Sequence, residues 1–448
     1  MLLDSVRLVW ACDYSSGILR SESCKAAIHH WRRRAVILLR GPCMSEIRRQ
    51  PDRNINLYTN YRSHASCENY AGSHPLGSHE RPPLASAWPI PHQQAQEEIP
   101  QRPLQVIHVS TAMTASGIDN WLTALIRHAD PRYLKFTRCI VTSNSVDYKQ
   151  VLRVGVPVEI GGAESVRRAA GECDVLLVSD PGEHPSWIGE VDPRLCVIVA
   201  HGDGEWTRQR LEWMRPIVHH VIAVSRGVRE AVCNEFDTTI IPNGVDSSHI
   251  TRSRPRPQVR SRFGFAEQDF VLGFVGRFSL EKNPFALIEA VSLLPARFKA
   301  LLVGFGHLRE ELLDRANHLI PGRYALTCGD EHLGDLYHAM DAFCLPSYTE
   351  GYGLAIMEAM MCGRPVIVTP VGLAPDAIVN RVNGLVVTGE PASIAAAASL
   401  LEQHPDWAAS VGREAARYAD LHGHASLMAR GYEQLLWRLY RQRSASAI

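Results

Sequence analysis

Residues 342–361 have the sequence AFCLPSYTEGYGLAIMEAMM, which predicts a buried strand, a glycine-containing loop and a helix in immediate succession. The run Ala342–Pro346 is apolar, as expected of a parallel strand covered on both faces. Gly351 and Gly353 let the backbone approach a ligand closely, and the helix that follows offers free N–H groups to an anion. Strand, loop and helix in this order form one repeat of an α/β domain, whose ligands bind at the carboxyl ends of parallel strands.

The same alternation of short apolar runs and helical stretches extends outward through the chain from Leu104. A first series of strands is predicted at Gln105–Ser110, Arg138–Thr142, Asp174–Ser179, Leu195–Ala200, Val221–Ser225 and Thr239–Ile241. A second series is predicted at Phe270–Gly276, Ala300–Gly304, Ala325–Cys328, Ala342–Pro346, Val366–Thr369 and Leu385–Val387. Between the two series, the Arg- and Pro-rich segment 246–268 predicts a linker. Two doubly wound α/β domains follow, which we place at residues 104–250 and 268–423.

Residues 1–103 differ from the rest of the chain. They carry 13 Lys and Arg against 9 Asp and Glu, and seven of the 27 prolines lie between Gly72 and Pro103. Because residues 41–103 show no sustained periodicity, we predict that this basic extension is mostly irregular or disordered. A wrongly assigned start codon would explain it, and a functional basic tail is the alternative.

Charge and composition exclude several classes of protein. Lys and Arg number 47 and so do Asp and Glu, which argues against a nucleic-acid binder, whose affinity comes largely from neutralising phosphates. No apolar run approaches the ~20 residues that a transmembrane helix needs, and the N-terminus lacks a signal-peptide core. The 11 cysteines are scattered without a CxxC pair, which favours reduced thiols and a cytoplasmic protein.

Two carboxylates flank the predicted loop and helix. Glu350 precedes the helix, and Glu358 lies about five residues into it, roughly 7–8 Å along its axis. Each carboxylate accepts two hydroxyl protons, so the pair suits the two ends of a nucleotide sugar. The spacing alone favours solvated surface charge, but the Pro-Ser-x-x-Glu-Gly-x-Gly context reverses that preference.

A second stretch, residues 273–284, has the sequence GFVGRFSLEKNP. A predicted strand ends at Gly276, Arg277 leaves its carboxyl end, and Lys282 follows in the loop before Pro284 starts a helix. An arginine fork and a lysine point charge suit a diphosphate. Lys282 is one of only five lysines in an arginine-rich chain, which disfavours the alternative of a chance solvated cation.

Taken together, four segments resemble, in order and spacing, a retaining glycosyltransferase of family 4 (glycosyl transferases group 1) with the GT-B fold. These are Ile241–Asp246, Gly276–Arg277 with Lys282, Leu302–Gly306, and Pro346–Gly353 with Glu358. The resemblance covers the chain from about Leu104 to its end. It implies two Rossmann-like domains that face each other across a cleft, with the last helix, about 424–443, packing back on the first domain.

The resemblance also implies roles for individual residues. Glu350 would contact the donor sugar and Glu358 the nucleotide ribose, while Arg277 and Lys282 would hold the diphosphate. Tyr352 stands where the family usually has Phe, a mild departure because backbone N–H groups make the contact. The donor site implied in this way comprises Arg277, Lys282, Gly304, Glu350, Gly351, Tyr352, Gly353, Leu354, Glu358 and, from the first domain, Gly117.

In the first domain, the family has a Gly-Gly loop near the phosphates, and this chain has Ser116 followed by Gly117. His201 ends a predicted strand, where the family places a contact to the acceptor or the donor sugar. We expect His201 to be catalytic together with Glu350, Arg277 and Lys282. An ordinary structural histidine is the alternative.

The resemblance implies transfer of a hexose-type sugar, with retention, from a nucleotide-diphosphate sugar to a hydroxyl of a glycan, lipid-linked or small-molecule acceptor, as in bacterial polysaccharide biosynthesis. We expect no cofactor and no metal, since the chain has no strict Asp-x-Asp; Asp203-Gly-Glu205 is the nearest candidate for magnesium. The alternatives are a sugar-nucleotide epimerase of the same fold and a non-catalytic nucleotide-sugar-binding protein. The helix predicted around residues 206–215 mixes Trp and Arg, which makes it a candidate for peripheral membrane contact, with a core-packing helix as the alternative.

Overall fold

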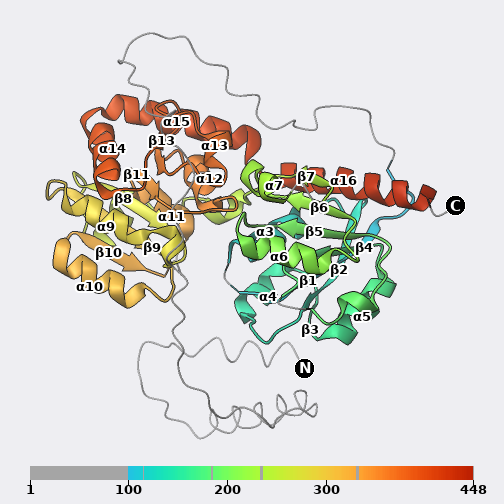
Figure 1. The fold of residues 1–448 in the computed structure, drawn as a ribbon. Helices are drawn as coiled ribbons and strands as arrows, with labels where there is room; N and C mark the ends of the chain where they lie inside the picture. The colour runs from blue at the N-terminus through green and yellow to red at the C-terminus, as the bar shows by residue number, and fades with distance from the viewer. Residues whose placement is uncertain (1–98, 115, 183–184, 233–235, 329–331, 447–448) are drawn as a thin grey trace, which may run out of the picture. The chain divides into compact units, whose positions relative to one another are not determined.

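The computed structural model describes residues 99–446, apart from 115, 183–184, 233–235 and 329–331. The predicted irregular extension, residues 1–103, therefore lies outside the described residues except for its last five. Two parallel β-sheets are formed in the described ranges, each with helices packed against it (Figure 1). The two doubly wound α/β domains predicted from the sequence are confirmed.

The first sheet has the strand order β3-β2-β1-β4-β5-β6-β7, and every neighbouring pair is parallel. Its central strands are buried because their apolar runs are covered on both faces. Its strands are β1 (Leu104–Ser110), β2 (Leu134–Val141), β3 (Val158–Ile160), β4 (Val175–Val178), β5 (Cys196–Ala200), β6 (His220–Ala223) and β7 (Thr238–Ile240). The helices between them are α3 (Gly117–His128), α4 (Tyr148–Val154), α5 (Ala163–Glu172), η3 (Ile188–Glu190), α6 (Glu205–Met214) and α7 (Arg226–Val232).

The second sheet has the order β10-β9-β8-β11-β12-β13 and is also parallel. Its strands are β8 (Phe270–Val275), β9 (Phe298–Val303), β10 (Tyr324–Thr327), β11 (Ala342–Leu345), β12 (Val366–Val368) and β13 (Leu385–Val386). Its helices are η5 (Leu280–Lys282), α9 (Pro284–Ser292), α10 (Arg309–Leu319), α11 (Leu333–Ala339), α12 (Leu354–Met361), α13 (Ala374–Ala377), α14 (Pro391–Gln403) and α15 (Pro405–His422). In both sheets the strand order reverses beside the first strand, at β1/β4 and β8/β11, where ligands of such folds bind.

Two local elements differ from the sequence-based expectation. The segment predicted as a linker contains η4 (Ser247–Ile250) and the helix α8 (Arg256–Arg262). The buried guanidinium of Arg260 explains α8, because it donates to the carbonyl of Ala339 and pairs with Asp341. The edge strand β3 was not predicted, since it has three residues and none is fully buried.

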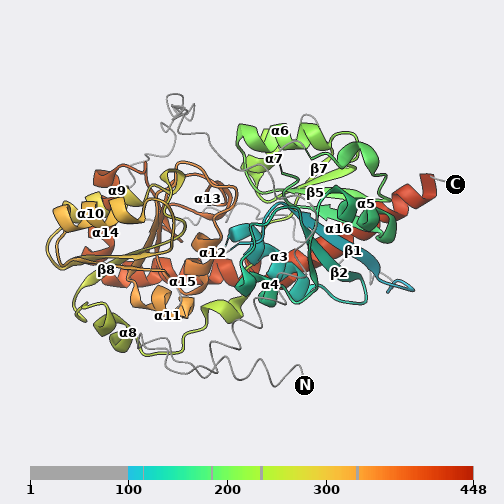
Figure 2. The same cartoon turned by 90° about the horizontal axis from the view of Figure 1, so that it is seen from below.

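The last helix, α16 (Ala425–Ser446), packs against α3 of the first domain (Figures 1 and 2). Trp437 Nε1 donates to the Tyr133 carbonyl at 3.0 Å, and Arg443 Nε donates to the Arg194 carbonyl at 2.8 Å. No helix of the described ranges is long and apolar enough to cross a membrane.

The chain passes between the domains twice, and the two crossovers lie side by side. Val245 N donates to the Gly423 carbonyl at 2.7 Å, and Ala425 N donates back to the Val245 carbonyl at 3.0 Å. Gly244 permits this approach, because a Cβ there would lie 2.4 Å from the Cα of Ala425.

Candidate active site

The loop between β11 and α12 holds Glu350 in a fixed position. Lys282 Nζ donates to Glu350 Oε2 at 2.6 Å, and Ser347 Oγ donates to Glu350 Oε1 at 2.8 Å. The Glu350 side chain is only 5% exposed, so both carboxylate oxygens are tied where water has little access. Gly353 then starts α12 from a left-handed conformation at φ 92°, which explains why glycine stands there. The structure thus brings together two predicted residues, Lys282 and Glu350.

The second carboxylate, Glu358, is the fifth residue of α12 and is held by a tyrosine of α11. The hydroxyl of the buried Tyr337 donates to Glu358 Oε2 at 2.7 Å. Burial raises the pKa of Glu358 above its usual value, and the Tyr337 hydrogen bond partly opposes that rise. Burial thus favours the protonated form of Glu358, and the Tyr337 hydrogen bond favours the carboxylate, the form that accepts hydroxyl protons.

The loops after β8 and β9 meet at the predicted phosphate-binding stretch. A Cβ on Gly304, whose φ is 153°, would lie 1.9 Å from the Gly276 carbonyl oxygen, so only glycine fits. Arg277 is exposed, and its guanidinium forms no hydrogen bond with another residue of the described ranges. The Arg277 guanidinium is therefore accessible to a ligand at the carboxyl end of β8.

His201 meets the Glu350 loop through the backbone. A Cβ on Gly351 would lie 1.7 Å from the His201 carbonyl oxygen, which means that the two backbones touch. Beside this contact, Thr349 Oγ1 donates to Asp203 Oδ1 at 2.8 Å. The carboxyl ends of β5 in the first sheet and β11 in the second thus come together around two predicted residues, His201 and Gly351.

The His201 ring is packed edge-on against Trp121, with ring centroids 4.7 Å apart. Its Nε2 is buried and has no hydrogen-bond partner among the described residues. Burial lowers the pKa of His201 to about 3, so the imidazole is neutral near pH 7. A neutral ring whose Nε2 has no hydrogen-bond partner can form a hydrogen bond with a ligand hydroxyl.

Gly117 begins α3 and lies against the second domain. A Cβ there would be 3.8 Å from Leu354 Cδ1, so the first residues of α3 and α12 are neighbours. Ser116 caps α3, because its Oγ accepts from the Asp119 N–H at 3.3 Å and donates to Asp119 Oδ2 at 2.6 Å. The serine that replaces the family's glycine therefore serves the helix, and Gly117 stays beside Leu354.

Tyr352 is buried, and its carbonyl accepts from the Leu373 N–H at 2.8 Å. The neighbouring Gly372 has φ 63°, and a Cβ there would lie 2.7 Å from Glu350 Cβ. The Tyr352 side chain therefore supports the loop, and a ligand contact from its backbone stays a prediction.

Sequence reasoning missed three supporting residues. Tyr337 lies 21 residues before Glu358, and a tyrosine on a helix carries no signal for this role. Thr349 and Asp203 bond across 146 residues, a pairing that one sequence cannot reveal. Asp203, the nearest candidate for magnesium, accepts from a hydroxyl instead, and among the described residues no group of three metal-binding side chains is assembled.

The predicted Trp- and Arg-rich helix is α6, and its charges are compensated. Arg208, Arg210 and Arg215 pair with Glu205, Asp180 and Glu212. Its Trp206 ring is 49% exposed, with the Arg210 guanidinium 4.8 Å from the ring centroid. Membrane contact through α6 stays a prediction.

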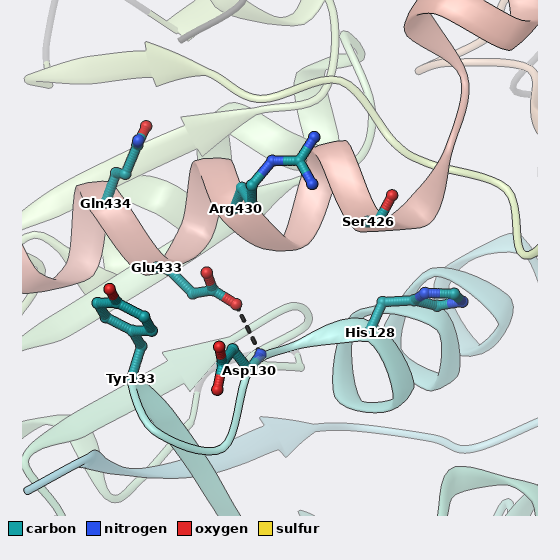
Figure 3. A pocket seen from close by; sticks show the side chains of 7 residues that line it. All are labelled: His128, Asp130, Tyr133, Ser426, Arg430, Glu433 and Gln434. Atoms are coloured by element: carbon teal, nitrogen blue, oxygen red, sulfur yellow. Dashed lines mark hydrogen bonds between the residues drawn. The ribbon is translucent and has the colours of Figure 1, made fainter. Parts of the chain in front are cut away.

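A pocket of about 350 Å³ lies away from these residues, between α16 and the end of α3 (Figure 3). In that view Glu433 points from α16 toward the backbone N–H of Asp130, from which its Oε1 accepts a hydrogen bond at 2.7 Å. The pocket is lined by His128, Asp130, Tyr133, Ser426, Arg430, Glu433 and Gln434. Because His128 and Gly117 are at opposite ends of α3, this pocket is separate from the candidate site.

Known proteins resemble this chain in sequence and in fold. Residues 255–418 match the family model described as glycosyl transferases group 1. A D-inositol 3-phosphate glycosyltransferase of Salinispora arenicola is 34% identical over 201 residues, which are 40% of this chain and 45% of that protein. A putative teichuronic acid biosynthesis glycosyltransferase, TuaC of Bacillus subtilis, is 32% identical over 155 residues, covering 34% of this chain and 39% of that one. The chain thus spans less than half the length of these curated relatives.

Solved structures match over both domains. The crystal structure of Anabaena Alr3699/HepE in complex with UDP and glucose has a TM-score of 0.65 at 21% identity, covering 74% of this chain and 99% of that one. The structure of WaaG, a glycosyltransferase involved in lipopolysaccharide biosynthesis, has a TM-score of 0.59 at 16% identity, covering 74% and 99%. Likeness at this identity shows the fold, and the GT-B fold predicted from the sequence is confirmed.

Proposed function

We propose, from the match of residues 255–418 to the family model of glycosyl transferases group 1, that this protein transfers a sugar from a nucleotide-diphosphate donor to a hydroxyl acceptor. The proposal includes a hexose-type sugar and retention of configuration. It also includes catalysis without a metal or cofactor, and an acceptor that is a glycan, a lipid-linked sugar or a small molecule.

One observation carries the proposal: predicted residues from both domains meet at the carboxyl ends of their strands. Lys282 is 2.6 Å from Glu350, whose neighbour Gly351 touches the His201 backbone. Gly117 lies beside Leu354 at the start of α12. An α/β fold binds its ligands at this edge, so the Lys282–Glu350 pair and the start of α12 support a sugar-nucleotide site here.

The residues provide a consistent chemistry. When the sugar leaves, negative charge develops on the diphosphate, and fixed cations aimed at it lower the barrier. Arg277 and Lys282 supply these cations, and the start of α12 adds free N–H groups. Glu350 would bind sugar hydroxyls and Glu358 the ribose. Because Glu350 is already tied by Lys282 and Ser347, we favour front-face attack by the acceptor hydroxyl over a covalent glycosyl intermediate.

His201 fits a hydrogen-bonding role better than that of a general base. Its pKa of about 3 leaves little basicity near pH 7, so it would hold a donor-sugar or acceptor hydroxyl through its unpaired Nε2.

The first test is donor binding. Since the Anabaena neighbour was solved with UDP and glucose, UDP-glucose is the first candidate, with GDP-glucose and ADP-glucose for comparison. A donor at 100 times its Kd stabilises the protein by about 2.7 kcal/mol, which thermal denaturation detects. No shift with any sugar nucleotide would contradict the proposal.

Turnover and stereochemistry are tested next. Glu358→Ala and Lys282→Ala should each nearly abolish nucleoside diphosphate release, whereas the control Glu310→Ala, at an exposed position of α10, should not. NMR of the product gives the anomeric configuration, and inversion would refute retention. Full activity in EDTA is expected, and its loss with recovery on adding Mg²⁺ would refute metal independence.

A further inference from the structure

A second pocket, of about 270 Å³, lies beside the crossovers between the domains. One crossover contributes η4 and the residues after it, the other contributes His424, and the second domain contributes α11, α15 and the end of α12. Its lining consists of Ser247, Ile250, Thr251, Arg252, His338, Met361, Cys362, Ala416, Asp420 and His424. Met361 and Cys362 are at the C-terminal end of α12, opposite the end that faces the candidate active site.

The polar part of this lining favours an anion. Arg252 is exposed and forms no hydrogen bond or ion pair with another described residue. Ser247 adds a hydroxyl donor, and His338 and His424 add ring nitrogens, whereas the Thr251 hydroxyl donates to the Ser247 carbonyl at 3.2 Å. The one carboxylate of the lining, Asp420, is engaged by His424 Nε2 at 3.1 Å.

The surroundings carry more positive than negative charge. Arg364, Arg252 and Arg256, after burial itself, lower the pKa of His338, which shows that arginines surround it. The Arg364 guanidinium donates to the carbonyls of Cys362 and Met340, both at 3.1 Å, and to no carboxylate among the described residues. Nearby, Asp335 is occupied by the Ser253 hydroxyl and two backbone N–H groups. Arg256 pairs with Asp341, whereas Arg252 and Arg364 have no carboxylate partner among the described residues, so these two arginines give the pocket its positive field.

We propose that this crossover pocket binds a phosphate-bearing anion, held by Arg252 with the Ser247 hydroxyl. The site goes beyond the proposed glycosyl transfer and does not depend on it. The pocket is lined by both crossovers and by the second domain. Ligand binding there is therefore thermodynamically coupled to any change in the arrangement of the two domains.

The test uses the full chain with Arg277→Ala as background, so that phosphate binding at the candidate active site is removed. Inorganic phosphate and glycerol 3-phosphate are titrated separately at constant ionic strength, with NaCl as the balancing salt, and thermal denaturation reports binding. The stronger of the two responses tells whether free phosphate or a phosphomonoester is the better occupant.

The expected result is a saturable rise of the melting temperature that Arg252→Ala weakens at least tenfold in apparent Kd. Arg252→Lys should keep part of the response, because it keeps the charge but loses the fork. Arg413→Ala is the matched control, an exposed arginine on α15 outside the pocket, and should bind normally. No response to either compound, or an equal response in Arg252→Ala, would overturn the site without touching the proposed transfer activity.

Discussion

Replacing Gly351 by alanine tests whether the two domains must touch at this point for catalysis. The added Cβ would lie 1.7 Å from the His201 carbonyl oxygen, 2.6 Å from its carbonyl carbon and 3.2 Å from Gly202 N. Both obstacles are backbone, so no side-chain rotation relieves the clash. A normal C···O contact is about 3.5 Å, so the Glu350 loop and the His201 loop must separate by roughly 1.5–2 Å.

The separation has a large effect on activity and a small one on stability. A misplacement of about 1 Å in an active site costs on the order of 10²-fold in rate, so we expect kcat/KM to fall at least 100-fold. The Thr349–Asp203 hydrogen bond would be lost as well, at about 1 kcal/mol. Because the clash joins two domains, they relieve it by moving apart, and each core keeps its packing.

Release of nucleoside diphosphate measures the activity, and thermal denaturation measures the stability. Gly189→Ala is the matched control, since nothing lies within 4 Å of a Cβ at that position. Turnover of Gly351→Ala within twofold of the unchanged protein would refute the requirement for contact. Loss of the cooperative transition would show instead that the two loops belong to one rigid core.

Three further outcomes are expected. Lys282→Ala leaves the buried Glu350 carboxylate without its cation and should cost about 1–3 kcal/mol of stability, measured by chemical denaturation. Adding Glu350→Gln to the same chain should restore part of that stability. Equal stability of the single and double variants would contradict the pairing. Tyr337→Phe removes the hydrogen bond that lowers the pKa of Glu358, so the pKa of Glu358 rises. Donor binding, measured as Kd from pH 5 to 8, should then weaken first at the acidic end. An unshifted pH profile would count against a role of Tyr337 in holding Glu358. Burial raises the pKa of Asp174, but hydrogen bonds from an arginine, a backbone N–H and a tyrosine outweigh it and hold that pKa at about 2. This stabilisation is therefore full above the unfolded value near 3.9 and fades as the pH falls toward 2, so Asp174→Asn should lower the melting temperature at pH 7 more than at pH 3.

The strands were predictable where burial of both faces requires a continuous run of apolar residues. β5 and β11 are continuous apolar runs because both faces are covered, and the pattern needs no knowledge of neighbours. β3 escaped prediction because an edge strand of three half-exposed residues has no such pattern. α8 escaped for a different reason: it owes its place to tertiary contacts of Arg260 in a segment rich in proline and arginine.

The candidate site was predictable within each motif but not between motifs. Glu350 and Glu358 share one strand–loop–helix unit, so their relation follows from helix geometry. The contact of Lys282 with Glu350 depends on β8 and β11 being neighbours in the sheet, which strand order decides and sequence order does not. Tyr337 contacts Glu358 because α11 and α12 lie close together in the fold. A single tyrosine in the sequence does not indicate this contact.

The two domains meet at Gly351 through their backbones rather than through side chains. At Gly351 the contact is between backbones, so the distance from Glu350 to His201 does not depend on which side chains surround it. Two side-chain contacts also join the domains: the Thr349–Asp203 hydrogen bond and the ion pair of Arg226 with Asp376. An exposed ion pair contributes about 0–1 kcal/mol, but the Asp376 side chain is only 5% exposed, so separating the domains here leaves a buried carboxylate without its cation and costs more than that.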